Sequence, residues 1–167
     1  MRVLGIDPGT GICGFGVVDF KPGKKPKMIT AGVISTPAHT PLSERLVDIH
    51  DSLNEIIEET KPDVMSVEKL FFAQNVTTAI SVAHARGVVV LVGAKANLPI
   101  YEYTPLQIKQ TLTGYGRADK KQMQEMVRLH LNLKSVPKPD DAADALAAAI
   151  TCDLMERGNL LATKEQN

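Results

Sequence analysis

The chain has 167 residues, of which 44% are hydrophobic and 23% are charged, and its formal net charge is zero. This length suits one domain with a substantial core, and the composition excludes an intrinsically disordered chain. The longest apolar run, residues 87–94, is too short to cross a bilayer, and the N-terminus does not resemble a signal peptide. We therefore expect a cytoplasmic protein whose two cysteines, Cys13 and Cys152, are reduced.

The first third of the chain predicts an antiparallel meander. Residues 2–7, 13–20 and 28–35 are apolar or alternate between two faces, and turns rich in Gly and Pro separate them. Residues 42–60 then carry Leu and Ile at helical spacing among acidic residues, which predicts an amphipathic helix.

The rest of the chain predicts two further strands and four helices. In chain order these are a strand at 64–67, a helix at 75–94, a strand at 100–103, and helices at 105–112, 119–132 and 139–157. This order predicts a mixed sheet with helices packed on it. We expect a single domain at residues 1–157 and a short, flexible tail at residues 158–167.

Charge is distributed unevenly along these elements. Residues 39–68 carry eight acidic and two basic residues, a local charge of −6, whereas residues 95–138 carry eight basic and three acidic residues, a local charge of +5. A basic face of this kind suits a polyanion such as nucleic acid. A solvated helix face and charged loops would give the same numbers of acidic and basic residues. Charge alone therefore does not show whether the chain binds nucleic acid.

The segment Gly9–Gly14 spells G-x-G-x-x-G, but its context does not match a dinucleotide site. Such a fingerprint opens a helix and is followed by an acidic residue about 20 positions on. Here strand-forming residues follow, and residues 28–42 contain no Asp or Glu. Asp7, in the turn Asp7-Pro8-Gly9, either caps its own backbone or projects a functional carboxylate from the end of the first strand.

Three more carboxylates can join Asp7 in one site. Glu68 ends a second buried strand, and the carboxyl ends of neighbouring parallel strands share one edge of a sheet. Asp141 and Asp144 lie three residues apart and share one face of a helix. Helix capping would account for Asp140 and Asp141, but not for Asp144, which stands among Ala and Leu.

Carboxylates without a matching set of histidines or cysteines favour Mg²⁺ or Mn²⁺ over zinc. Two such ions about 3.5–4 Å apart would activate a water molecule and stabilise the leaving oxygen of a phosphodiester. The sequence therefore predicts metal-dependent hydrolysis of a phosphodiester at these acids.

Together the motifs resemble the RuvC-type Holliday junction resolvases of bacteria, also called crossover junction endodeoxyribonucleases. The resemblance covers about residues 3–152 in order, and it rests on these segments: GIDPGT, GFGVV, VEKLFFAQN, ARG, QIKQTLTGYGRADKKQMQ and DAADALAAAI. It implies a ribonuclease-H-like fold with a five-stranded mixed sheet. It also implies a homodimer that nicks opposite strands of a four-way DNA junction in recombination and repair, with a branch-migration helicase complex of the RuvA and RuvB type as partner.

The resemblance also assigns roles to individual residues. It places the metal-binding, catalytic acids on Asp7, Glu68, Asp141 and Asp144, with two Mg²⁺ ions per site. It places the junction-contacting aromatic on Phe71 and basic residues of the site on Lys109 and Lys120. Arg117 and Lys121 lie in the same basic part of the chain and can neutralise phosphates.

Some alternatives stay open at this point. Three of these assignments have a neighbouring residue as the alternative. The third acid is Asp141 or Asp140, and the spacing to Asp144 favours Asp141. The aromatic is Phe71 or Phe72, and the basic residue is Lys120 or Lys121. A related nuclease acting on RNA or RNA–DNA hybrids, or a junction-binding protein without catalysis, would use the same fold. A sugar kinase or actin-like ATPase needs a second D-x-G loop, which the chain lacks.

The apolar helix at 75–94 is the expected dimer contact.

Overall fold

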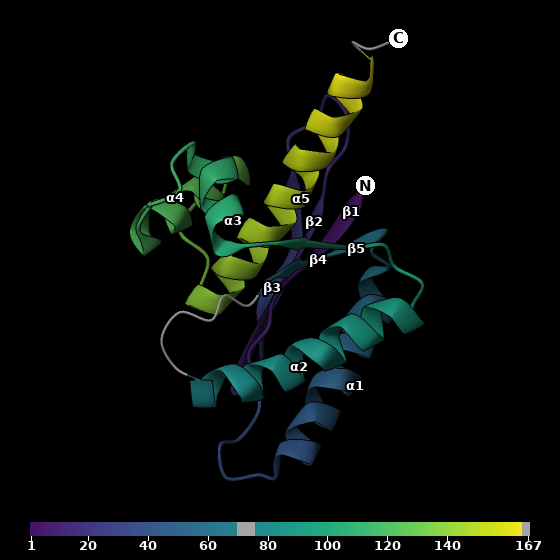
Figure 1. Ribbon diagram of the computed structural model, residues 1–167. Coiled ribbons are helices and arrows are strands. Elements are labelled where there is room, and N and C mark those ends of the chain that lie inside the picture. The colour runs from purple at the N-terminus through teal and green to yellow at the C-terminus, as the bar shows by residue number, and fades with distance from the viewer. Residues whose placement is uncertain (70–75, 165–167) are drawn as a thin grey trace.

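The computed structural model describes residues 1–69 and 76–164 and shows one five-stranded sheet with helices on both faces (Figure 1). The strands are β1 (Arg2–Asp7), β2 (Ile12–Asp19), β3 (Lys27–Ser35), β4 (Val64–Glu68) and β5 (Ile100–Tyr103). The helices in the described part of the chain are α1 (Leu42–Thr60), α2 (Val76–Lys95), α3 (Pro105–Thr113), α4 (Lys120–His130) and α5 (Asp140–Lys164). Within these residues, no helix is long and apolar enough to span a membrane.

The sheet has the order β3-β2-β1-β4-β5, and its pairing places the ends of β1 and β4 together. β1, β2 and β3 pair antiparallel, which confirms the predicted meander. β4 is parallel to β1 and β5 is parallel to β4, so β1 and β4 are the parallel neighbours that were expected. Consequently Asp7 and Glu68 leave the sheet at the same edge.

The two faces of the sheet hold separate apolar cores. Along β1, the buried side chains of Leu4 and Ile6 belong to a core with α1 and α2, whereas Val3 belongs to a core with α3, α4 and α5. This division follows from the two-residue period of a strand, which sends alternate side chains to opposite faces. The result is a three-layer α/β/α arrangement with α5 lying directly across the strands.

Glycines on the sheet allow α5 to lie unusually close to it. A β-carbon at Gly5 would overlap the backbone carbonyl of Ala145, and one at Gly14 would overlap the carbonyl of Asp141. The facing residues of α5 are mostly alanines, and they are almost wholly buried. The G-x-G-x-x-G segment leads into strand β2 rather than into a helix, unlike a dinucleotide-binding loop. Gly14 at its end makes room for the helix that carries Asp141 and Asp144.

Two predicted helix ends differ from the structure by two residues or more, and the other helix ends agree to within one residue. α5 was predicted to end at residue 157 but continues to Lys164, and an i,i+4 ion pair of 2.9 Å between Asp153 and Arg157 stabilises this part of the helix. α4 was predicted to reach residue 132 but ends at His130, because Asn132 adopts a left-handed conformation with φ of 51°.

Candidate active site

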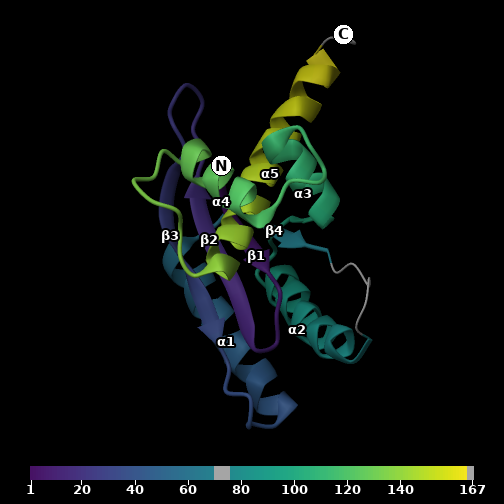
Figure 2. The ribbon, with the colours of Figure 1, turned by 90° about the vertical axis from the view of Figure 1, so that its left-hand side faces the viewer.

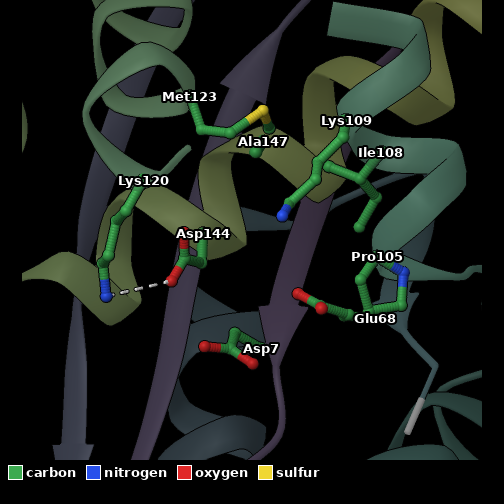
Figure 3. Close-up of a pocket in the computed structure, with 9 residues that line it drawn as sticks. All are labelled: Asp7, Glu68, Pro105, Ile108, Lys109, Lys120, Met123, Asp144 and Ala147. Carbon is green, nitrogen blue, oxygen red and sulfur yellow. Dashed lines mark ion pairs between the residues drawn. The ribbon is translucent and has the colours of Figure 1, made fainter. Parts of the chain in front are cut away.

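Three of the four predicted acids line one cavity of about 260 Å³ at the carboxyl edge of the sheet. Asp7 comes from the end of β1, Glu68 from the end of β4, and Asp144 from the second turn of α5. Figure 3 shows their carboxylates turned toward a common space. The cavity is also lined by Pro105, Ile108, Lys109, Lys120, Met123 and Ala147, so α3 and α4 complete its wall.

Asp141 lies beside this cavity, close to Asp7. The antiparallel register pairs Asp7 with Gly14, and Asp141 sits directly over Gly14 on the face covered by α5. The charge of Asp141 contributes to raising the pKa of Asp7, after burial and the charge of Asp144. The structure therefore brings Asp141 into the same electrostatic cluster as Asp7 and Asp144.

Asp140, the alternative to Asp141, is engaged elsewhere. Its exposed carboxylate accepts a hydrogen bond of 2.9 Å from the Gln124 side chain, and it lies 3.1 Å from the Lys120 ammonium. The hydrogen bond from Lys120, followed by its charge, lowers the pKa of Asp140. Asp140 thus joins the start of α5 to α4, which supports Asp141 as the acid that belongs to the cluster.

The clustered carboxylates resist ionisation. Burial, followed by the charges of Asp144 and Asp141, raises the pKa of Asp7 to about 7, with Lys120 acting in the opposite direction. Burial, followed by the charges of Asp7 and Asp144, raises the pKa of Glu68 to about 8, with Lys109 opposing. Burial likewise raises the pKa of Asp144. Positive charge in this cavity would favour the ionised form of all three groups.

The donor chemistry of the cavity fits a hard divalent cation. Its acidic lining consists of carboxylates, and neither a histidine nor a cysteine lines it, which suits Mg²⁺ rather than zinc. In the described part of the chain, no three His, Cys, Asp or Glu side chains already stand in a metal-holding arrangement.

Two lysines reach the cavity from different helices. Lys109 lies on α3, and Lys120 is the first residue of α4, with its ammonium 3.7 Å from Asp144 (Figure 3). Lys121 instead lines a separate cavity between α4 and the loop before it, and Arg117 lies exposed in that loop. The structure thus places Lys120, rather than Lys121, beside the acids. Phe71 and Phe72 lie outside the described residues.

A hydrogen-bond network that sequence reasoning missed holds the turn after Asp7. The Thr36 hydroxyl donates to the Thr10 carbonyl, and the Thr36 N–H donates to the Gly11 carbonyl over 3.0 Å. Arg45 of α1 donates from Nε to the Thr36 hydroxyl over 2.9 Å. No local motif marks these residues, because the pairing of β2 with β3 brings them together from distant parts of the chain.

Known proteins resemble this chain over almost its whole length. The sequence family described as crossover junction endodeoxyribonuclease RuvC matches residues 3–152. The chain belongs to the RuvC family. Its relatives include RuvC from Brevibacillus brevis, 56% identical over 90% of each chain, and RuvC from Thermomicrobium roseum, 54% identical over 90% of this chain and 91% of the relative.

Solved structures support the RuvC assignment and the predicted fold. Thermus thermophilus RuvC in complex with a Holliday junction substrate matches with a TM-score of 0.90 and 38% identity, over 95% of this chain and 96% of that chain. The yeast mitochondrial Holliday junction resolvase Ydc2 matches with a TM-score of 0.66 at 16% identity, over 95% and 82% of the two chains, and shows the fold alone. The predicted ribonuclease-H-like, five-stranded mixed sheet is confirmed.

Proposed function

We propose that this chain is a metal-dependent endodeoxyribonuclease that resolves four-way DNA junctions by paired, symmetric nicking in recombination and repair in the bacterial cytoplasm. The observation that carries the proposal is the shared cavity of Asp7, Glu68 and Asp144 in a chain that matches RuvC almost throughout. The Thermus thermophilus relative was solved with a Holliday junction, which supports the same substrate class here.

Asp7, Glu68, Asp141 and Asp144 are the proposed ligands of two Mg²⁺ ions. Bound there, the ions would supply an activated water as nucleophile and positive charge for the leaving oxygen of the phosphodiester. Asp7 is coupled to both Glu68 and Asp144, because the charge of Asp144 raises the pKa of Asp7 and the charge of Asp7 raises the pKa of Glu68. The closely packed α5 fixes Asp141 and Asp144 against the strand ends, which preorganises the ligand set.

Lysines orient the scissile phosphate in this proposal. Lys109 and Lys120 line the cavity, where they can pair with non-bridging phosphate oxygens. The ion pairs of Lys120 with Asp140 and Asp144 hold its ammonium at the mouth of the site. The pKa values of Asp7 and Glu68 are raised to about 7 and about 8, so the full set of carboxylates ionises only when cations bind near neutral pH. Cleavage is therefore proposed to require the metal.

Further residues are proposed to hold the junction arms. Arg117 and Lys121 are exposed near the start of α4 and can neutralise backbone phosphates without reading sequence. Phe71 follows Glu68 by three residues and is proposed to stack on an unpaired base at the crossover. A branch-migration helicase complex of the RuvA and RuvB type is the proposed protein partner.

The dimer is proposed to form through α2. Ile80 and Leu91 of this helix are 57% and 54% exposed, and the exposed residues Ala83 and Gly87 between them are small enough for a second helix to approach closely. The opposite face of α2 packs on the sheet, and Arg86 anchors the helix through an ion pair with Glu102 of β5. Two copies related by symmetry would present two active sites to one junction.

Leu91→Glu should therefore convert the dimer into a monomer, because each copy would place a charge in the apolar contact. Sedimentation velocity measures the change, and Leu129→Glu on α4, at an equally exposed leucine of 54%, is the matched control. A wild-type chain that sediments as a stable monomer, or a Leu91→Glu chain that remains a dimer, would contradict the proposed interface.

The proposed activity is tested by single-turnover cleavage of a synthetic mobile four-way junction in Mg²⁺. Linear duplex and an RNA–DNA hybrid are run alongside as controls. We expect paired nicks at symmetric positions on the junction alone. Cleavage of the hybrid in preference to the junction would assign the same fold and acids to an RNA-directed nuclease, and tight junction binding without cleavage would overturn the enzymatic assignment.

A further inference from the structure

The loop between α3 and α4 has a fixed backbone. Gly114 ends α3 with φ of 71°, and its N–H donates to the Gln110 carbonyl. The Thr113 hydroxyl then accepts the N–H of Tyr115 over 3.0 Å, and it lies 2.8 Å from the carbonyls of both Lys109 and Tyr115, to one of which it donates. At the other end of the loop, the Asp119 side chain caps α4 by accepting the Gln122 N–H over 2.8 Å. Tyr115 is therefore presented from a preorganised position.

The side chain of Tyr115 is exposed on this rigid loop. It is 56% accessible and is the one aromatic among the large apolar side chains exposed in residues 1–69 and 79–158. Next to it, a β-carbon at Gly116 would press on the exposed side chain of Leu106, so the loop packs over the start of α3. Tyr115 also forms one wall of a largely apolar cavity of about 460 Å³ whose rim carries Lys121. An exposed aromatic beside an apolar recess indicates a contact surface.

The charge around Tyr115 selects the kind of partner. Arg117, Lys120 and Lys121 lie within six residues of it. Among the residues with described side chains, neither Arg117 nor Lys121 forms an ion pair, and both are exposed, whereas the acidic Glu125 on the rim is engaged by Arg128. Unpaired guanidinium and ammonium groups around an aromatic ring favour a polyanion over an acidic or neutral apolar surface.

The loop also lies within reach of DNA that occupies the active site. Tyr115 precedes Lys120, which lines the catalytic cavity, by five residues, so at most about 18 Å of chain separates them. This span is roughly half of the ~34 Å helical turn of duplex DNA. The loop is therefore close enough for an arm whose scissile phosphate lies at the acids to contact it.

We infer that the α3–α4 loop binds the sugar–phosphate backbone of the junction arm next to the scissile phosphate, with the Tyr115 ring packed on deoxyribose and Arg117 paired with a phosphate. This inference rests on the proposed function and deepens it by assigning a DNA contact to Tyr115. The contact is independent of base sequence, because it involves sugar and phosphate only.

The test measures the affinity of the full chain for a fluorescently labelled four-way junction by anisotropy, in Ca²⁺ and at several salt concentrations. Tyr115→Ala should weaken binding about tenfold without changing the slope of log affinity against log salt. Arg117→Ala should reduce that slope by about 0.9, the value for one lost phosphate contact. Tyr115→Phe keeps the ring and should bind like the wild type.

Lys24→Ala is the matched control, because it removes an exposed positive charge from the turn between β2 and β3 (Figure 2). This turn follows the end of β2 at Asp19, whereas Gly14 lies near the start of that strand. The inference would be overturned if Tyr115→Ala bound the junction with wild-type affinity, or if Tyr115→Phe lost as much affinity as Tyr115→Ala. It would also be overturned if Lys24→Ala changed the salt slope as much as Arg117→Ala. Circular dichroism checks that each variant is folded. A wild-type chain that neither binds nor cuts the junction would instead overturn the proposed function.

Discussion

Asp7→Asn is expected to abolish junction cleavage while leaving junction binding unchanged or tighter. Asp7 is electrostatically coupled to Glu68 and to the acids of α5, so the amide would remove a ligand proposed to be shared by the ions. Loss of a ligand carboxylate costs several kcal/mol of barrier, which leaves cleavage below about 1% of the wild-type rate. Binding should persist because the amide also removes a charge that repels phosphate. Single-turnover cleavage and anisotropy on the same junction measure the two effects separately.

Asp140→Asn is the matched control for this experiment, because it makes the same chemical change at an acid directed toward Gln124 and Lys120. It should retain most of the cleavage rate, whereas Asp141→Asn should lose it as Asp7→Asn does. Residual cutting by Asp7→Asn above about 1% would exclude Asp7 as a metal ligand. Loss of cleavage in Asp140→Asn but not in Asp141→Asn would reverse the assignment of the third acid.

Glu68→Gln should stabilise the protein at alkaline pH when divalent cations are absent. The pKa of Glu68 is raised to about 8 by burial and by the charges of Asp7 and Asp144. The folded state therefore holds a proton that the unfolded state releases near its ordinary pKa of 4.5. Because the folded state binds more protons in this window, the free energy of unfolding falls as pH rises from about 4 to 8. The amide of the Glu68→Gln variant does not titrate, so its free energy of unfolding does not fall for this reason as pH rises.

The expected gain is on the order of 2–4 kcal/mol in the free energy of unfolding near pH 9, and close to zero near pH 4. Urea denaturation in EDTA at several pH values measures it. Asp140→Asn is again the control, since the pKa of Asp140 is lowered by Lys120 and its removal should bring no alkaline gain. Mg²⁺ should stabilise the wild type more at pH 8.5 than at pH 6, because cation binding requires ionised carboxylates. If Glu68→Gln were no more stable than the wild type at alkaline pH, the raised pKa of Glu68 would be contradicted.

The sequence by itself determined the elements and the positions of the acids along them. Strand period and helix period are local properties, so the meander, the helix at 42–60 and the strand ends at Asp7 and Glu68 were predictable, and the structure agrees with them. The three-residue spacing of Asp141 and Asp144 placed them on one helical face for the same reason. The motif set in its order also identified the RuvC family, which the comparisons confirm.

The tertiary structure decided which of two neighbouring residues lies beside the cavity. Adjacent residues on a helix point about 100° apart, so the packing of α4 directs Lys120 to the cavity and Lys121 elsewhere. The packing of α5 places Asp140 beside Gln124 and Lys120, which agrees with the choice of Asp141 that the spacing favoured. The network of Thr36 and Arg45 and the role of Gly14 depend on contacts between segments far apart in the chain. Such contacts leave no local pattern in the sequence, because their geometry exists only after the sheet has paired and α5 has packed on it.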